Sequence, residues 1–238
     1  MKKFFVMFVA LFVVLSANFC SAAMEYRSVP VTHLKNYIGN WYNTDGDLLL
    51  TISSDYRING FKISSLGYTG DTVAFYKVQI TDGSSYGDVY LQTFGSYNGC
   101  HEMLVVNEQV ALRKTKEPRY VESVGGIYLG MDQNQVVARY GQPSSVENNR
   151  RSSTWTYNKE GFSVTLEYGV VSDITIYSYG NRRFDRSGLS ANSSRGDFER
   201  KYNTNVGSRG GLNIGNGEVL SIRDGKVSLS FFTAGMVF

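Results

Sequence analysis

The chain has very little cysteine, proline and histidine: two Cys, three Pro and two His among 238 residues. One of the cysteines, Cys20, lies in a predicted leader, so only Cys100 remains after processing and no intramolecular disulfide can form. Stability must then come from packing, even in an oxidising compartment. With only His33 and His101, the sequence offers little support for a zinc site or a Cys-His pair.

The chain also lacks a strong excess of either charge. Lys and Arg number 24 and Asp and Glu 21, a net charge of +3 that falls to about +1 once Lys2 and Lys3 are removed with the leader. This balance gives no indication of nucleic acid or of a strongly acidic partner.

No hydrophobic run is long enough to span a bilayer as a helix. The longest, Phe4 to Leu15, follows two lysines and precedes the small residues 16-SANFCSAA-23, the pattern of a secretory signal peptide. We expect residues 1–22 to be the signal, with cleavage after Ala22 or Ala23, and a periplasmic or extracellular protein. Lipid modification of Cys20 is disfavoured because Phe19 stands where such a site needs a small residue.

Tyr, Phe and Gly are abundant, with 17, 14 and 25 copies. Between Gly39 and Thr115, short alternating runs separated by turns predict six antiparallel strands, at 39–44, 47–53, 57–66, 72–80, 86–94 and 101–115. Thr81-Asp82-Gly83 and Asn98-Gly99 are typical of hairpin turns. We predict a small antiparallel β-barrel or curled meander as a domain over residues 23–119.

The entry to this domain, 34-LKNYIGNWYNT-44, places Gly-x-Trp at the start of the first strand. It resembles the lipocalin-like, or calycin, opening. The resemblance implies that Trp41 lies under the barrel with Arg113 across it as a cation–π lid. Trp41 is then either a core residue closing the barrel end or part of a site for an apolar ligand or lipid, and the aromatics that could line such a site could equally be core.

The stretch 129-LGMDQNQVVARYGQP-143 predicts a short capped helix. Asp132 is the N-cap with Gln135 at N3, a capping box, and Met131 and Val136 occupy the hydrophobic-staple positions. Gly141 suits the left-handed position after the helix, and Pro143 ends it. Because an eight-residue helix is marginal alone in water, a sheet must cover its apolar face, which includes Tyr140.

Three alternating runs follow and predict that sheet: Trp155 and Tyr157, then Phe162 to Leu166, then Val171 to Ile176. Together with Gly130-Met131-Asp132, Val136 and Gly141-Gln142-Pro143, the pattern over about residues 124–178 resembles the BamE (SmpA/OmlA-like) outer-membrane assembly lipoproteins. The resemblance implies a two-layer α/β sandwich over residues 120–182 and a role in outer-membrane assembly or integrity. The motif residues Gly130, Met131, Asp132, Val136, Tyr140, Gly141, Pro143, Trp155 and Tyr157 would then be structural.

A degenerate second copy is predicted over residues 183–238. Ser194, Asp197, Phe198 and Tyr202 repeat the spacing of the first helix, and 218-EVLSI-222 and 226-KVSLSFF-232 repeat two of its strands. A third strand is missing and is either supplied by the neighbouring repeat or left as an open edge. Tandem sandwiches of this α+β class resemble the secreted β-lactamase inhibitor proteins in architecture.

Four patterns suggest chemistry and are explained better by structure. Gly83-x-Ser85-x-Gly87 lies in a predicted hairpin, Cys100-His101-Glu102 on a strand, and Arg195-Gly196-Asp197 in the first turn of a helix. The Gly-rich 207–217 precedes a strand, so it is not a phosphate-binding loop but a connector or interaction loop. We therefore predict no catalytic residues, no cofactor site, no metal site and no enzyme.

These patterns predict a non-enzymatic interaction module of the bacterial cell envelope that contacts a protein partner. The expected contact regions are the rim from Gln142 to Arg151 and the loop from Gly207 to Gly217. The alternatives are a binder of an apolar small molecule or lipid in the barrel, and an inhibitor of a secreted enzyme, which needs a surface formed jointly by both repeats.

Overall fold

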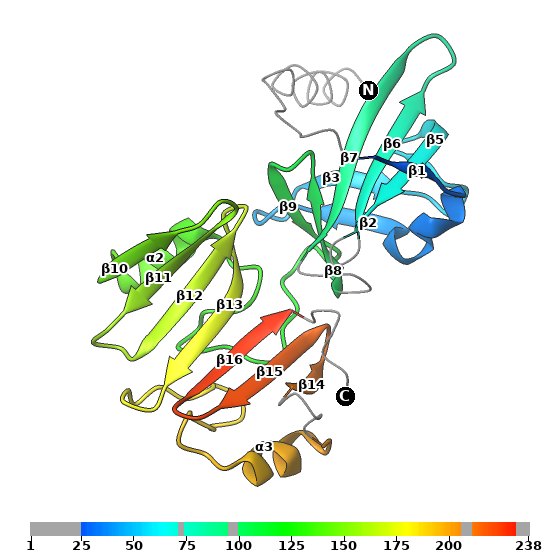
Figure 1. Cartoon of the computed structure of the whole chain (residues 1–238). Helices are drawn as coiled ribbons and strands as arrows, with labels where there is room; N and C mark the ends of the chain where they lie inside the picture. The colour runs from blue at the N-terminus through cyan, green and yellow to red at the C-terminus, as the bar shows by residue number, and fades with distance from the viewer. Residues whose placement is uncertain (1–24, 71–73, 95–99, 206–210, 232–238) are drawn as a thin grey trace.

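The computed structural model describes residues 25–70, 74–94, 100–205 and 211–231. They form a closed β-barrel and a separate antiparallel sheet, drawn in the upper and lower parts of Figure 1. They contain two α-helices and one 3-10 helix, so the chain is of the α+β class and mostly β. The predicted signal at 1–22 and the turn at Asn98-Gly99 lie outside these residues.

Eight strands close the barrel. In the order of their hydrogen bonding they are β5 (Phe61–Thr69), β4 (Arg57–Ile58), β3 (Leu48–Ile52), β2 (Gly39–Tyr42), β9 (Val110–Arg113), β8 (Cys100–Val106), β7 (Tyr86–Phe94) and β6 (Phe75–Thr81). The β5–β6 pairing completes the ring, and β1 (Arg27–Ser28) pairs with Tyr68 and Gly67 of β5, beyond the residues that pair with β4.

Two hairpins that the sequence did not predict account for the difference between six strands and eight. Asn59 and Gly60 both adopt positive φ, 49° and 86°, and split the predicted strand 57–66 into β4 and β5. Asn107 and Glu108, with φ of 54° each, do the same between β8 and β9. Consecutive residues of positive φ are typical of tight two-residue turns, and Asn-Gly is the strongest sequence signal for one. The predicted turn at Thr81-Asp82-Gly83 is confirmed between β6 and β7.

The barrel interior is filled by side chains. Ile52, Val78 and Leu104 are fully buried in one apolar cluster, and so is Trp41 at the end where the 3-10 helix η2 (Val31–Tyr37) crosses. The Trp41 indole Nε1–H donates to the carbonyl oxygen of Tyr37 at 2.8 Å, which satisfies the buried donor. Trp41 is therefore a core residue that ties η2 to the barrel end.

The second sheet has seven strands: β10 (Ser145–Asn148), β11 (Ser152–Tyr157), β12 (Phe162–Glu167), β13 (Val170–Tyr177), β16 (Lys226–Phe231), β15 (Glu218–Arg223) and β14 (Gly211–Gly215), in spatial order. The repeats are joined where β13 pairs with β16, with Ile174 opposite Leu229. The two predicted sandwiches therefore share one sheet. The prediction that the second repeat lacks a third strand is wrong, because β14 pairs with β15 within that repeat.

Both short helices form where the sequence predicts them. Helix α2 (Gln133–Tyr140) has a capping box between Asp132 and Gln135, and Gly141 follows with φ of 71°. Helix α3 (Arg195–Tyr202) has the same box between Ser194 and Asp197 and ends at a left-handed Asn203. The predicted capping boxes are confirmed at the starts of both helices, whereas Gly141 has a positive φ but a ψ of −160° and so is not in the predicted left-handed conformation.

The two helices lie on the same face of the sheet. Val136 of α2 and Phe198 of α3 are fully buried in one cluster with Val164, Ile174 and Leu229 of the strands. The connecting segments add Val124, Ile127, Leu129 and Phe184 to this cluster. Each helix is short and mostly exposed, so it is only marginally stable alone in water. Its stability comes from this contact with the sheet.

The barrel is continuous with this core. Met103 and Val105 of β8 and Ala111 of β9 point outward from the barrel and are buried in the cluster of the sheet. A second contact is polar: the hydroxyl of Tyr168 donates to Gln92 Oε1 on β7 at 2.9 Å. In the part of the chain that the structure describes, no helix has both the length and the apolar character needed to cross a membrane.

The N-cap of α2 gives a test of this account. Replacing Asp132 by Ala leaves a donor at the helix start unpaired, so we expect the free energy of unfolding to fall by about 1 kcal/mol in urea titrations. Gln133→Ala, at the neighbouring exposed position, is the control and should change it by less than about 0.5 kcal/mol. Equal losses for both variants would contradict a specific role for the cap.

Candidate functional site

A row of hydroxyl side chains crosses the face of the sheet opposite the helices. The register places Thr156 beside Ser163, Ser163 beside Thr175, Thr175 beside Ser228 and Ser228 beside Ser221, a lateral row over five strands. Thr154, Thr165 and Ser230 extend it on the neighbouring row. We call these eight residues the hydroxyl face.

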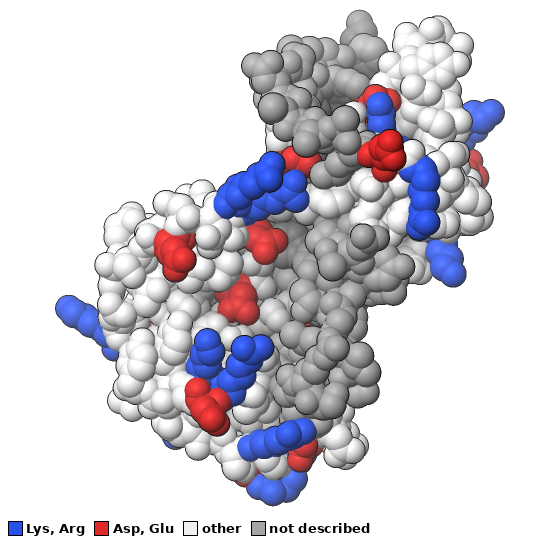
Figure 2. All heavy atoms as spheres, in the orientation of Figure 1, with Lys and Arg blue, Asp and Glu red and all other residues white. Residues whose placement is uncertain are grey.

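The hydroxyl face follows from the alternation that builds the core. Trp155, Val164, Ile174, Leu229 and Leu220 form the matching row on the helix side. Because successive residues of a strand point to opposite faces, burial of that row directs its neighbours outward. The sheet surface turned toward the viewer shows only scattered Lys, Arg, Asp and Glu (Figure 2).

Hydroxyl groups within the face pair with one another. Thr175 and Ser228 are 2.6 Å apart through their Oγ atoms, and Thr154 and Thr165 are 3.3 Å apart. Each hydroxyl can also donate or accept a further bond. Ser163 and Thr175 are buried and the other six residues are half-buried, so a partner would exchange hydrogen bonds mainly with the half-buried hydroxyls.

Two carboxylates lie among these hydroxyls, Glu167 on β12 and Asp173 on β13. Burial raises the pKa of Asp173 to about 6. The Thr175 hydroxyl donates a hydrogen bond of 2.9 Å to this carboxylate, which lowers the pKa and offsets part of that shift. Burial also raises the pKa of Glu167, and its charge adds to the shift at Asp173. Within the described ranges neither carboxylate forms an ion pair. A cation brought by a partner would be attracted to this pair.

Both regions expected to make contacts contain strands that the sequence did not predict. The rim from Gln142 to Arg151 includes β10, an edge strand whose four residues are exposed, and Arg151 lies over the ring of Phe75 on the barrel at 5.6 Å. The Gly-rich 207–217 is not simply a connector, because Gly211–Gly215 forms β14 and pairs with β15. Residues 207–210 lie outside the described ranges.

The motif residues of the first repeat are placed as structural residues. Gly130 has φ of 83°, a backbone conformation that strains any residue with a side chain, and it faces Met103 of the barrel. The Tyr140 hydroxyl donates to the carbonyl of Gly125 at 3.0 Å, and that of Tyr157 donates to the carbonyl of Gly141 at 3.2 Å. Both bonds hold the C-terminal end of α2. Met131 is buried, while Pro143 and Trp155 are half-buried.

The predicted pairing of Trp41 with Arg113 is wrong. The guanidinium of Arg113 donates to the backbone carbonyls of Thr44, Thr115 and Lys116. The cation over the Trp41 ring is Lys114, 5.9 Å from its centroid. Successive residues of an extended chain point to opposite sides, so Arg113 and Lys114 point apart. A motif that is aligned one residue away from its true position therefore predicts the wrong cation over Trp41.

The patterns set aside as chemistry lie where expected. Ser85 is in the β6–β7 turn, where its backbone N–H and that of Ser84 donate to Asp82 Oδ1 at 2.8 Å each. Arg195-Gly196-Asp197 opens α3. Within the described ranges, no three His, Cys, Asp or Glu side chains gather in a way that could hold a metal ion.

Two fully buried glutamates fasten the segment between barrel and sheet. Glu218 on β15 accepts the backbone N–H of Val121 at 2.7 Å and of Glu122 at 3.1 Å. Glu122 accepts the hydroxyl of Tyr202 and the backbone N–H of Arg186. Burial raises the pKa of Glu218 to about 7, and it also raises the pKa of Tyr202. Sequence reasoning missed these residues, because the charged Glu218 in a strand pattern reads as exposed.

This raised pKa makes stability depend on pH. The folded chain binds the Glu218 proton more tightly than the unfolded chain, so the contribution is full below about pH 4.5 and is lost as the pH rises through about 7. Relative to Glu218→Gln, we expect the wild-type free energy of unfolding to fall by about 3 kcal/mol between pH 4.5 and 7.5 in urea titrations.

The exposed Glu117→Gln is the control and should run parallel to the wild type. If Glu218→Gln also runs parallel, Glu218 ionises as an ordinary carboxyl and the burial argument fails.

The comparisons with known proteins found no match. No family model, no curated protein and no solved structure matches the chain. What the chain does is therefore argued from its own geometry.

Proposed function

We propose that the chain is a non-enzymatic protein-binding module of the bacterial envelope, and that the hydroxyl face is its docking surface. The observation that carries this is the single sheet: both repeats place their helices and connecting segments on one face. The other face presents a row of hydroxyls over five strands.

The partner's chemistry follows from the carboxylates. Asp173 and Glu167 are desolvated and form no ion pair among the described residues, although the charge of Lys226 lowers the pKa of Asp173. A further Lys or Arg side chain on the partner's surface fits beside them. Arg is enriched at such interfaces because its guanidinium binds carboxylates with two hydrogen bonds. The short hydroxyl side chains around them let the partner's backbone come close.

The export pattern and the BamE-like motif support a partner in the bacterial envelope. The signal-like residues 1–22 favour delivery across the inner membrane. The motif from Gly130 to Tyr157 supports a role in outer-membrane assembly or integrity.

Inhibition of a secreted enzyme is the second candidate, because that role needs a surface formed by both repeats and the shared sheet provides one. A partner that is a hydrolase, and that loses activity when bound, would favour this candidate. A ligand in the barrel interior is not favoured, because Trp41, Val78 and Leu104 belong to a filled core.

Capture from envelope extract with immobilised wild type and variants tests the surface. Thr154→Arg and Ser228→Arg place bulky cations on the hydroxyl face, and we expect both to reduce the captured partner about tenfold or more by quantitative mass spectrometry. Gln133→Arg, on the exposed side of α2, adds the same group elsewhere and should capture as the wild type does. Equal capture by all variants would exclude this face.

The carboxylate at Asp173 predicts how the same binding responds to pH. Affinity for the captured partner should fall as the pH drops through about 6, because protonation of Asp173 removes the charge that attracts the partner's cation. Asp173→Asn should bind weakly at pH 7.5 and lose most of this pH dependence in binding titrations. A variant with the wild-type profile would show that the carboxylate takes no part.

A further inference from the structure

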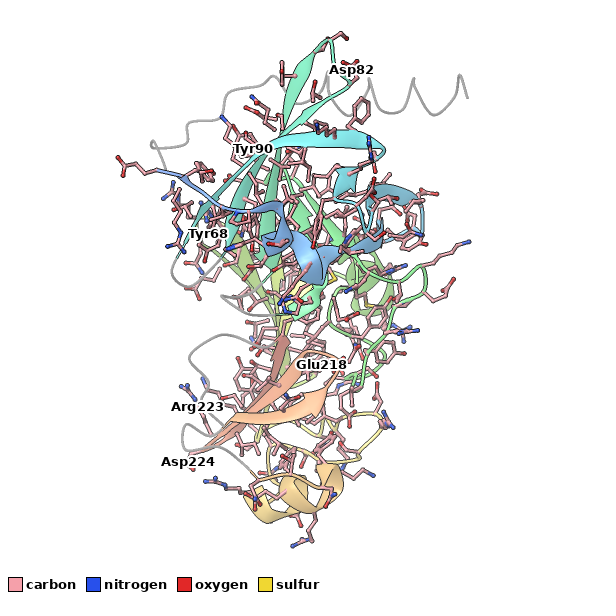
Figure 3. All side chains as sticks on the ribbon, turned by 90° about the vertical axis from the view of Figure 1, so that its right-hand side faces the viewer. Tyr68, Asp82, Tyr90, Glu218, Arg223 and Asp224 are labelled. Atoms are coloured by element: carbon pink, nitrogen blue, oxygen red, sulfur yellow. The ribbon has the colours of Figure 1, made fainter. Side chains whose placement is uncertain are left out.

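A pocket of about 400 Å³ opens at the η2 end of the barrel, outside the filled interior. It lies between β1, η2, β5, β6 and β8, and both histidines of the chain line it. Figure 3 shows Tyr68, one of its wall residues, on the barrel and far from Glu218 in the sheet. The pocket is therefore separate from the hydroxyl face, and the following inference does not depend on that face.

Five aromatic rings form a continuous wall of this pocket. His33 packs edge-on against Tyr68 at 5.9 Å between ring centroids, and Tyr68 lies 5.3 Å from Tyr76. Tyr76 lies 5.9 Å from Tyr37, and Tyr37 lies 5.5 Å from His101. Tyr37, Tyr68 and Tyr76 are buried, so the wall is held by the barrel core and is formed before a ligand arrives.

The charge at the pocket is positive. Arg27 and Lys35 line it, and none of the ten described lining residues is Asp or Glu. Strand β1 pairs Arg27 with Tyr68, and the guanidinium lies over the Tyr68 ring, 4.9 Å from its centroid. Lys114 adds charge behind the wall, where its ammonium donates to the carbonyl of Asn36 at 3.1 Å.

His101 contributes a hydrogen-bond donor without an acceptor. Burial, and then the charge of Lys114, lower the pKa of His101, so its ring is neutral at pH 7. The side-chain nitrogen of Asn36 lies 3.4 Å from Nε2 of His101, and in this orientation Nε2 accepts and the proton lies on Nδ1. Nδ1 is buried and has no hydrogen-bond partner among the described residues. An acceptor on a ligand would relieve this donor.

We propose that this pocket binds a small aromatic carboxylate, with its ring between Tyr37, Tyr68 and Tyr76 and its carboxylate toward Arg27 and Lys35. Planar rings fit the offset and edge-on spacing of the wall. A carboxylate meets two cations and, among the described lining residues, no acid, whereas an ammonium group would be repelled. The two cations, Arg27 and Lys35, distinguish this ligand class from an uncharged apolar one.

Three naphthalene probes of matched size and different charge test the proposal by titration calorimetry with the full chain. We expect 2-naphthoate to bind about tenfold or more tightly than 2-naphthylmethanol, since a charge-assisted hydrogen bond contributes about this factor. The cationic 2-naphthylmethylammonium should bind more weakly still. Equal affinity for all three, or no binding of 2-naphthoate up to millimolar concentration, would overturn the proposal.

Variants at exposed positions locate the binding without disturbing the core. Arg27→Ser and Lys35→Ser should each weaken 2-naphthoate binding about tenfold, while Lys62→Ser, at the far end of β5 from Tyr68, should leave it unchanged. Thr32→Trp, from an exposed position in the lining, fills the pocket and should abolish binding. If Thr32→Trp binds as the wild type does, the probe is bound elsewhere.

Trp41 provides a second readout at the pocket. It packs against Tyr37 with 6.4 Å between ring centroids, and Trp155 in the sheet is the only other tryptophan. In a Trp155→Phe background, Trp41 emission is followed during titration with benzoate and, as the non-aromatic control, with cyclohexanecarboxylate. We expect the emission to change with benzoate only. The same change with both acids would show that the aromatic wall does not select the ligand.

Discussion

The pairing of β13 with β16 is the contact on which the arrangement of the C-terminal half depends. The second repeat has only three strands, and its apolar residues Val227 and Leu229 need a neighbour on the β16 side. β13 supplies that neighbour, so two marginal units become one sheet with one core. The same pairing aligns Thr175 with Ser228 and so makes the hydroxyl face continuous between the repeats.

The barrel and the sheet solve the problem of exposed strand edges differently. The barrel closes through β5 and β6, whereas the sheet keeps β10 and β14 at its edges. Met103 and Val105 lock the two together by entering the sheet's core from the outside of the barrel. The proposed docking surface and the proposed pocket thus lie on separate parts of one molecule: the first uses hydroxyls on a sheet, and the second uses rings around a barrel end.

Much of the local structure could be predicted because its causes lie within a few residues. The capping boxes at Asp132 and Ser194 fix the starts of the helices through hydrogen bonds between the N-cap and the residue three positions later. Asn59-Gly60 carried an equally local turn signal, but the apolar alternation around it suggested one long strand. Asn107-Glu108 gave a weaker signal, since Glu is uncommon at positive φ and the barrel's closure imposes the turn there.

The α+β class, the two capped helices and the alternation of the strands could be predicted, because these depend on neighbouring residues and on a period of two. The closure of eight strands, the joining of the repeats and the cation over Trp41 could not. Those depend on which distant segments meet, as do the burial of Glu218 against Val121 and the assembly of His33, Tyr68 and His101 around one pocket. Contacts between residues so far apart in the chain are set by packing, for which a single sequence carries no periodic signal.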